Sequence, residues 1–443
     1  MGRINKWLYP GIGVKRWVAT FLAGGFLTLL GAVLALGPQH VWRWGLNALT
    51  HFQQITGTTP QQGGLLLMMA GLALLYLGGR NLSVSVLGLF LPHEEGRVVD
   101  LLYRRRLLQR GPHLVVIGGG TGLSVLLRGI KEYTSNITAV VNVCDDGGSS
   151  GRLRGDMGIL PPGDIRNCLL ALADTEPVMK RLFQHRFTTG ELAGHNFGNL
   201  FIAAMSEQME FKEAIKEFSK VLAVRGQVLP VTLEAVTLEA QLVDGALLRG
   251  QSNIARAQGP IKRVALSPPG SRALPEVLQA LAHADAIILG PGSLFTSVIP
   301  NLLVPEVREA VARSPAKKYY VCNVMTQPGE TTGFTAAQHL ETLEEYLGSG
   351  VIDYFIVNEA RDIPRELRER YREEGAQLVT PDAEKIKDKR IKVIKGHLSA
   401  GRELIRHDAG LLAKIIMESL LQEGNWAGST HPHLSHRTIS KGR

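Results

Sequence analysis

The amino-acid sequence predicts an α/β fold: a doubly wound, Rossmann-like parallel sheet with a small antiparallel insertion, preceded by a two-helix transmembrane hairpin. Three observations predict it. Two long uncharged apolar stretches lie near the amino terminus. From residue 113 to residue 422, short apolar runs alternate with amphipathic stretches, as strands joined by helical crossovers do. Residues 236–252 instead alternate around Asp244 and Gly245, which is typical of a β-hairpin.

Residues 1–92 are predicted to form the membrane hairpin, with spans at about 17–36 and 63–79. Neither span contains a charged residue, and the first is about long enough to cross a bilayer. The second is slightly short, and the alternative is that it extends past Arg80 into residues 81–91. The alternative interpretation of the first span is a cleaved signal peptide. We favour the hairpin because a second apolar span follows and because the sparse cysteines indicate a reducing compartment.

Basic residues orient the hairpin. The loop between the spans carries only Arg43, whereas arginines are frequent in residues 93–112, the predicted basic juxtamembrane linker. Four basic residues precede the first span: Arg3, Lys6, Lys15 and Arg16. By the positive-inside rule both termini and the main domain are cytoplasmic, which predicts a multi-pass protein of the cell membrane. This location accounts for much of the net charge of +9, so nucleic acid is not expected as a partner.

Residues 113–422 are predicted to form the main cytoplasmic domain. Residues 423–443 are polar and patternless, which predicts a disordered tail. Helices are expected, among others, at 122–133 and 211–224. The predicted strands are residues 113–118, 137–143, 284–290, 318–324 and 351–357. The three cysteines form no CxxC pair and are expected to be small core residues: Cys144, Cys168 and Cys322.

A glycine-rich loop ends the first predicted strand and opens a helix. Glycines let the backbone approach a diphosphate, whose charge is stabilised at the helix amino terminus. The loop does not match GxGxxG, because Leu123 stands where the third glycine belongs, and it is not a P-loop. The alternative is a tight turn that needs positive φ. The candidate ligand-binding residues here are Gly118, Gly119, Gly120, Thr121 and Gly122.

Acidic and small residues follow the second predicted strand. Asp145 and Asp146 lie at its carboxyl end, where doubly wound sheets bind ligands, and either carboxylate could hold a ribose hydroxyl or a magnesium ion. Ser149 and Ser150 belong to a candidate anion nest, and Arg152 could pair with a phosphate. The alternative is an acidic turn followed by a solvated basic face.

Further polar residues stand at other predicted helix starts. Asp164 could be a helix cap as readily as a catalytic group, and Asn196 opens another helix beside His195. A second strand–glycine loop–helix unit offers Gly290, Gly292 and Ser293 as anion donors. The remaining candidate ligand contacts are Asn301 two turns into that helix, Asn323 after the next strand, and Arg406 at a late helix start.

The sequence contains no GxSxG elbow, no HExxH and no catalytic Cys-His signature. Glycine, aspartate, asparagine, arginine, serine and threonine dominate the candidate site, and these residues bind sugar hydroxyls and phosphates without announcing a nucleophile. No catalytic residue is therefore assigned, and a binding protein is favoured over an enzyme.

Five motifs together resemble the bacterial gluconeogenesis factor family, which is related to the CofD-type 2-phospho-L-lactate transferases. They are "GGGTGLSVLLRG", "DDGGSSGRLR", "PPGDIRN", "GPGSLFTSVIPNLLVP" and "NVMTQPGET", and the resemblance covers about Pro112 to Leu420. It implies a nucleotide-type ligand at the strand ends. Gluconeogenesis factors bind UDP-sugars such as UDP-N-acetylglucosamine and are associated with cell shape and wall synthesis. The transferases use magnesium and a guanosine diphosphate carrier. The resemblance implies ligand contacts at Thr121, Asn301 and Arg406.

Three functional hypotheses follow. The first is a membrane-tethered UDP-sugar-binding regulator of envelope synthesis during gluconeogenic growth, which needs no cofactor for binding. The second is a transferase of a phospholactyl-type group from a nucleotide-diphosphate donor, with magnesium on Asp145 or Asp146. The third is a purely structural membrane scaffold, against which the polar strand ends argue. Expected partners are the UDP-sugar, the membrane, cell-wall synthesis proteins and a second copy of the chain.

Overall fold

The computed structural model describes residues 14–35, 60–90, 106–257, 259–359, 364–386, 388–400 and 405–422. The chain divides into two compact units, residues 1–105 and 106–443. The predicted disordered tail and most of the predicted linker lie outside the described residues.

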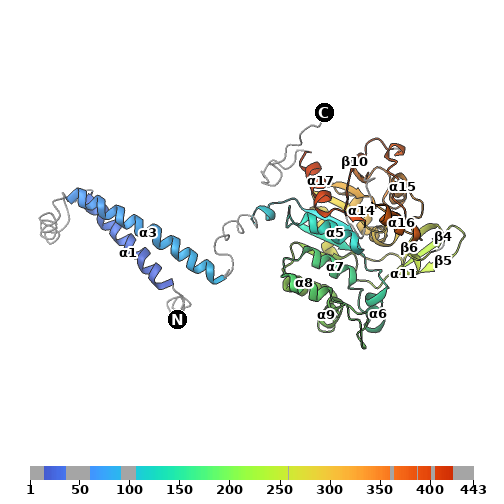
Figure 1. Ribbon diagram of the computed structural model, residues 1–443, viewed down its shortest axis with the longest axis horizontal. Helices are drawn as coiled ribbons and strands as arrows, with labels where there is room; N and C mark the ends of the chain where they lie inside the picture. The colour runs from blue at the N-terminus through green and yellow to red at the C-terminus, as the bar shows by residue number, and fades with distance from the viewer. Residues whose placement is uncertain are drawn as a thin grey trace. The chain divides into compact units, whose positions relative to one another are not determined.

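The first unit contains two long apolar helices, α1 (Val14–Ala35) and α3 (Pro60–Phe90), which lie side by side and antiparallel (Figure 1). The stretches within them that could cross a membrane are Arg16–Ala35 and Gln62–Ser83, with mean hydropathies of 2.1 and 1.5. Helix α3 begins before the predicted span and continues eleven residues past it, to Phe90 rather than Gly79. By length and composition alone, both helices are candidates for membrane spans.

Glycines form the contact between α1 and α3. A Cβ added at Gly24 would lie 2.6 Å from the backbone nitrogen of Leu75, and one at Gly31 would lie 2.4 Å from that of Met68. On α3, Gly64 and Gly71 meet α1 in the same way, at a seven-residue spacing. The backbones touch directly because small residues leave no side chain between them, which is a packing mode common in membranes.

The outer faces of the two helices carry large apolar side chains. Leu29 is 70% exposed, Phe26 67% and Tyr76 71%. A water-soluble helix pair would bury such residues and leave polar ones outside. The distribution, with small residues inside and large apolar residues outside, suits a hydrocarbon environment.

We expect Gly24→Leu to separate α1 from α3, whereas Gly25→Leu should not. Leucine at position 24 collides with the α3 backbone, but a Cβ at position 25 meets only a Leu75 methyl group at 3.9 Å. Overpacking of this kind costs about 1–3 kcal/mol. Spin labels on the exposed Phe26 and Leu72 would report the separation in detergent as a longer distance. Equal distances in both variants would contradict the glycine contact.

The second unit is built on a seven-stranded parallel sheet in the order β10-β9-β8-β7-β1-β2-β3 (Figure 1). The parallel α/β prediction is confirmed, with the five predicted strands at its centre. The bounds are β1 Leu114–Gly118, β2 Ile137–Val141, β3 Gln227–Pro230, β7 Ala286–Leu289, β8 Lys317–Val321, β9 Tyr354–Asn358 and β10 Lys392–Gly396.

Helices cover both faces of the sheet. In β1, Val115 and Ile117 pack into one core cluster while Leu114 and Val116 pack into another, because successive side chains point to opposite faces. Both faces are buried, which is why these strands read as continuous apolar runs. One face packs against α5 (Gly120–Ile130), α7 (Gly163–Leu172), α10 (Phe211–Val221) and α17 (Ala409–Gln422), and the other against α12 (Pro275–Ala282), α14 (Pro305–Arg313) and α15 (Ala336–Leu347).

The two edge strands were not predicted from the sequence. Strand β10 carries Lys392 and Lys395 and is only partly buried, while β3 is four residues long and ends at Pro230. Edge strands bury less surface than central ones and often carry charge or proline, so their apolar pattern is weak.

The predicted antiparallel insertion is present as a three-stranded sheet in the order β5-β4-β6. Its strands are β4 (Thr237–Leu242), β5 (Leu247–Arg249) and β6 (Ile261–Ser267). The turn between β4 and β5 is at Asp244 and Gly245, where the Asp244 carboxylate accepts a hydrogen bond from the Ala246 amide at 2.9 Å. The hairpin prediction is therefore confirmed, whereas β6 was not predicted.

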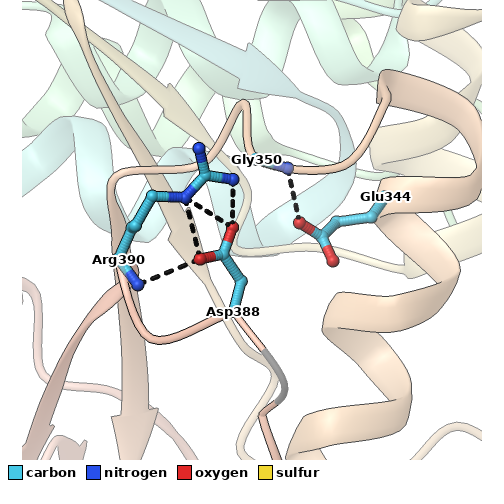
Figure 2. A network of polar contacts seen from close by, with 4 residues as sticks. All are labelled: Glu344, Gly350, Asp388 and Arg390. Carbon is cyan, nitrogen blue, oxygen red and sulfur yellow. Dashed lines mark hydrogen bonds and ion pairs between the residues drawn. The ribbon is translucent and has the colours of Figure 1, made fainter.

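Polar contacts fasten the loops at the amino ends of β9 and β10 (Figure 2). Glu344 of α15 accepts the Gly350 amide at 3.1 Å, and Asp388 pairs with the Arg390 guanidinium at 2.7 Å. Hydrogen bonds from Arg390 lower the pKa of Asp388 to about 2. These contacts lie where the strands begin, at the end of the sheet opposite the strand carboxyl ends. The cysteines Cys144, Cys168 and Cys322 are free and buried, as predicted.

Candidate functional site

A cavity of about 370 Å³ opens at the carboxyl ends of the central strands. This volume suits a small ligand. Its position is the one that parallel α/β sheets use for ligands. Ten of the sequence-predicted site residues line it: Gly119, Gly120, Thr121, Gly122, Asp145, Asp164, Gly292, Ser293, Asn323 and Arg406.

The first glycine loop joins β1 to α5 and forms one wall of the cavity. Gly120 has φ +65, so this residue fits the alternative interpretation of the loop as a tight turn that needs positive φ. Gly122 has a different constraint: an added Cβ would lie 2.6 Å from the Pro291 carbonyl oxygen and 3.1 Å from the Gly292 nitrogen. The amino terminus of α5 faces the cavity here, which favours an anion.

The second glycine loop, Gly290 to Ser293, lies directly against the first. Its Gly292 amide donates to the Asn323 side chain at 3.2 Å, and the Ser293 hydroxyl accepts from Gln327 at 2.6 Å. A π-helix, η2 (Leu294–Val298), follows it. This helix brings Ser297 into the cavity lining. Two loops distant in sequence therefore meet at one side of the cavity.

Asp145 and Asp164 share the cavity. Asp164 does not cap α7, since Pro162 occupies the cap position; its carboxylate instead accepts the Gly120 amide across the cavity. Desolvation and the charge of Asp145 raise the pKa of Asp164 to about 6. Two carboxylates beside a diphosphate would repel it, so a divalent cation held by both fits these residues. No group of three or more metal-type side chains occurs among the described residues.

Asp146 follows Asp145 in the chain but does not line the cavity. Its carboxylate accepts the Ser252 amide at 2.8 Å, at the start of α11 (Gln251–Ile254). Through this contact Asp146 fastens the antiparallel insertion to the sheet, and the insertion supplies Gln251 to the cavity lining. The magnesium site predicted on Asp145 or Asp146 stays a prediction, with Asp145 as the residue that lines the cavity.

Four candidate residues of the predicted anion nest and its neighbourhood make structural contacts instead. The Ser149 hydroxyl lies 3.2 Å from Nδ1 of His195, and the Ser150 hydroxyl accepts the Gly163 amide. Arg152 donates to the Ala193 carbonyl, and Asn196 caps α9 (Phe197–Ser206). None of Ser149, Ser150, Arg152 and Asn196 lines the cavity.

Asn301, Gly118 and Gly290 also lie behind the cavity wall. Asn301 is fully buried, and its side chain donates to the carbonyls of Ser297 at 2.8 Å and Gly118 at 3.2 Å. It therefore joins the π-helix to the end of β1. Asn301 does not line the cavity, and the ligand contact that the resemblance implied there stays a prediction.

Arg406 lies at the cavity rim, in the short strand β12 (Arg406–His407) rather than at a helix start. Arg406 is exposed. Burial lowers the pKa of Arg128, and the positive charge of Arg406 lowers it further. Burial of the neighbouring His407 lowers its pKa to about 4, so this imidazole is neutral at pH 7. Arg406 is thus the cation of the lining and can meet a phosphate.

Nine lining residues were not among the sequence-predicted ligand contacts. Ser297 and Gln327 lie within motifs quoted above, and His407 follows the candidate Arg406, so their positions could have suggested them. The apolar members carry no chemical signal that the sequence could reveal. The nine are Val125, Gln251, Pro291, Ser297, Val324, Met325, Gln327, Ile405 and His407.

Comparison with known proteins places this site in a family context. Residues 114–399 match the family described as 2-phospho-L-lactate transferase CofD. A gluconeogenesis factor of Bacillus subtilis is 49% identical over 312 residues, which are 70% of this chain and 98% of that protein. A Nostoc sp. relative is 43% identical over 439 residues, 97% of this chain and 94% of its own length.

A solved structure shares the fold of the second unit. It is a member of the UPF0052 family from Bacillus halodurans, 45% identical, with a TM-score of 0.67. The match covers 69% of this chain and 99% of that one. The Nostoc sp. relative extends across nearly the whole chain, whereas the Bacillus proteins correspond to its second unit in length.

Proposed function

The chain belongs to the CofD family, and from this premise we propose that it is a gluconeogenesis factor that binds a UDP-sugar such as UDP-N-acetylglucosamine while tethered to the membrane. It acts in this proposal as a regulator of envelope synthesis rather than as an enzyme. Cell-wall synthesis proteins and a second copy of the chain are its proposed protein partners.

One observation carries the ligand proposal: the two glycine loops meet at the carboxyl ends of neighbouring strands β1 and β7. The first loop opens α5, whose amino-terminal N–H groups lack intrahelical acceptors, and the second loop contributes the Ser293 hydroxyl to the cavity. A diphosphate between the loops would receive donors from both. Arg406 at the rim would neutralise part of its charge.

The remaining lining suits the nucleoside and sugar parts of such a ligand. Asn323, Gln327 and Gln251 offer amide donors and acceptors for hydroxyl and carbonyl groups. Val324 and Met325 add a small apolar wall. A few placed polar groups beside an apolar surface are typical of small-molecule sites.

The membrane part of the proposal is supported by the helix pair α1 and α3. Its glycine contact and its exposed apolar faces are both what a hydrocarbon surrounding favours. Such a tether would hold the nucleotide site beside the membrane on which cell-wall precursors are assembled.

The test is calorimetric titration of the full chain in detergent with UDP-N-acetylglucosamine, UDP-glucose and GDP, each with and without magnesium. We expect the UDP-sugars to bind and Arg406→Ala to weaken them roughly tenfold, because a charge-assisted hydrogen bond is lost. Arg390→Ala removes the same kind of side chain at the opposite end of the strands and should leave the UDP-sugar affinity unchanged. Failure of both UDP-sugars to bind would refute the ligand proposal. In a separate cell fractionation, recovery of the chain with the soluble proteins would refute the membrane tether.

A transferase is the second candidate, because Asp145 and Asp164 face one cavity and the family description names a transferase. Magnesium on these carboxylates would supply charge stabilisation for phosphoryl-group chemistry. Preference for GDP in the titration, or turnover of a nucleotide-linked donor, would favour this function over the regulator.

A further inference from the structure

A buried carboxylate behind the second glycine loop is not part of the cavity lining. Glu330 is 4% exposed and follows β8 in the chain. One of its oxygens accepts the Thr296 hydroxyl at 2.7 Å, and the other is buried without a hydrogen-bond partner. The backbone amides of Phe295 and Thr296 lie close enough to the carboxylate to favour its ionised form. Burying a carboxylate is costly, so a residue of this kind requires an explanation.

The partners of Glu330 explain its position. Phe295 and Thr296 are in the first turn of the π-helix η2, where backbone N–H groups lack acceptors within the helix. A π-helix is rare and is held by its surroundings rather than by its own propensity. Glu330 faces two of these amides at the helix amino terminus. Burial raises its pKa to about 7, and the Thr296 hydroxyl and the amides of Thr296 and Phe295 oppose this rise by favouring the ionised form.

The π-helix matters to the cavity because it lies between the two glycine loops. Its Ser297 lines the cavity, and its Oγ would lie 3.6 Å from a Cβ added at Gly120 of the first loop. The residue before the helix, Ser293, lines the cavity as well. A shift of this one turn would therefore displace groups on both sides of a bound diphosphate.

The segment that contains Glu330 makes two further contacts with the second loop. Asn323 accepts the Gly292 amide, and Gln327 donates to the Ser293 hydroxyl. Asn323 and Gln327 also line the cavity, whereas Glu330 does not. Of Asn323, Gln327 and Glu330, only Glu330 cannot contact a ligand in the cavity directly, so its effect on a ligand must pass through the π-helix.

We propose that Glu330 is a positioning residue of the nucleotide site: it caps the π-helix and thereby fixes Ser293 and Ser297 for the diphosphate. The ligand part rests on the proposed function, whereas the capping part does not. Glu330→Leu removes both acceptor oxygens in a side chain of similar size. Glu330→Gln keeps the length and one acceptor oxygen and serves as the matched control.

The capping part is tested by hydrogen exchange of the full chain in detergent without ligand. We expect the Phe295 and Thr296 amides to exchange about tenfold faster in Glu330→Leu and to stay close to wild type in Glu330→Gln. If Glu330→Leu does not fold, Thr296→Val removes the hydroxyl contact alone and should speed exchange in the same segment. Unchanged exchange in the folded variants would overturn the proposal.

The ligand part is tested by titration with UDP-N-acetylglucosamine. We expect Glu330→Leu to raise Kd about tenfold and Glu330→Gln to restore most of the affinity. Wild-type affinity in Glu330→Leu, with faster exchange at the π-helix, would overturn the positioning role. If the wild-type chain binds no UDP-sugar, the proposed function and the ligand part fail together, and the exchange experiment still decides the capping part.

Discussion

The Gly122→Ala variant is expected to lose UDP-sugar affinity by about tenfold to a hundredfold. The added methyl group would lie 2.6 Å from the Pro291 carbonyl oxygen and 2.9 Å from its carbon. Both atoms are backbone, so no side chain can rotate away, and the two glycine loops must move apart. Overpacking costs about 1–3 kcal/mol, and that range corresponds to the stated loss if the cost falls on the ligand-binding geometry.

Gly118→Ala is the matched control, four residues earlier at the end of β1. Its added Cβ would meet only the Leu123 side chain, at 3.6 Å or more, and Gly118 does not line the cavity. Calorimetric titration should therefore give near wild-type affinity for Gly118→Ala and a large loss for Gly122→Ala. Equal affinities would show that loop contact does not shape the site.

The central strands of the sheet could be predicted because each of them carries its signal in its own residues. Strands buried on both faces are apolar throughout, and glycine loops at their carboxyl ends mark the helix starts. The edge strands β3 and β10 lack this signal, since Lys392, Lys395 and Pro230 are tolerated only at an edge. Their existence depends on pairing with distant strands, which no local pattern records.

The site was partly predictable for a related reason. Glycines and Asp145 at strand ends were identified correctly as cavity-facing positions by type and place. Asp146 and Asn301 are polar as well, but they lie outside the cavity lining, where their side chains contact Ser252 and Gly118. Only the fold decides whether a polar side chain meets a ligand or another part of the chain.

The π-helix shows a further limit of the sequence. Residues 294–298 follow a glycine loop and were expected to open an ordinary helix, yet they form a wider turn capped by Glu330. Glu330 stands more than thirty residues later, and it meets the Thr296 hydroxyl and the neighbouring backbone amides only in the folded chain. No spacing rule connects the two segments.

Asp164→Asn is expected to raise the stability of the second unit at pH 7 by about 1–3 kcal/mol and to remove a pH dependence. The pKa of Asp164 is raised from 3.8 to about 6, so the folded state keeps a proton that the unfolded state releases. Stability from this group is therefore full below about pH 4, falls as pH rises to about 6, and is constant above. Asparagine cannot ionise but can still accept the Gly120 amide.

Denaturant unfolding between pH 4 and pH 8 would measure this difference, since the wild type should lose stability across the lower half of the range and Asp164→Asn should not. Asp145→Asn provides the second variant: it removes the charge that helps raise the pKa of Asp164, so the wild-type slope should end at a lower pH. The same charge removal should strengthen UDP-sugar binding without magnesium, because a carboxylate no longer opposes the diphosphate, and should weaken the effect of added magnesium. The same pH dependence in the wild type and Asp164→Asn would show that Asp164 has the same pKa in the folded and unfolded states. Asp145 would then not repel Asp164 measurably, and the argument for a cation between them would fail.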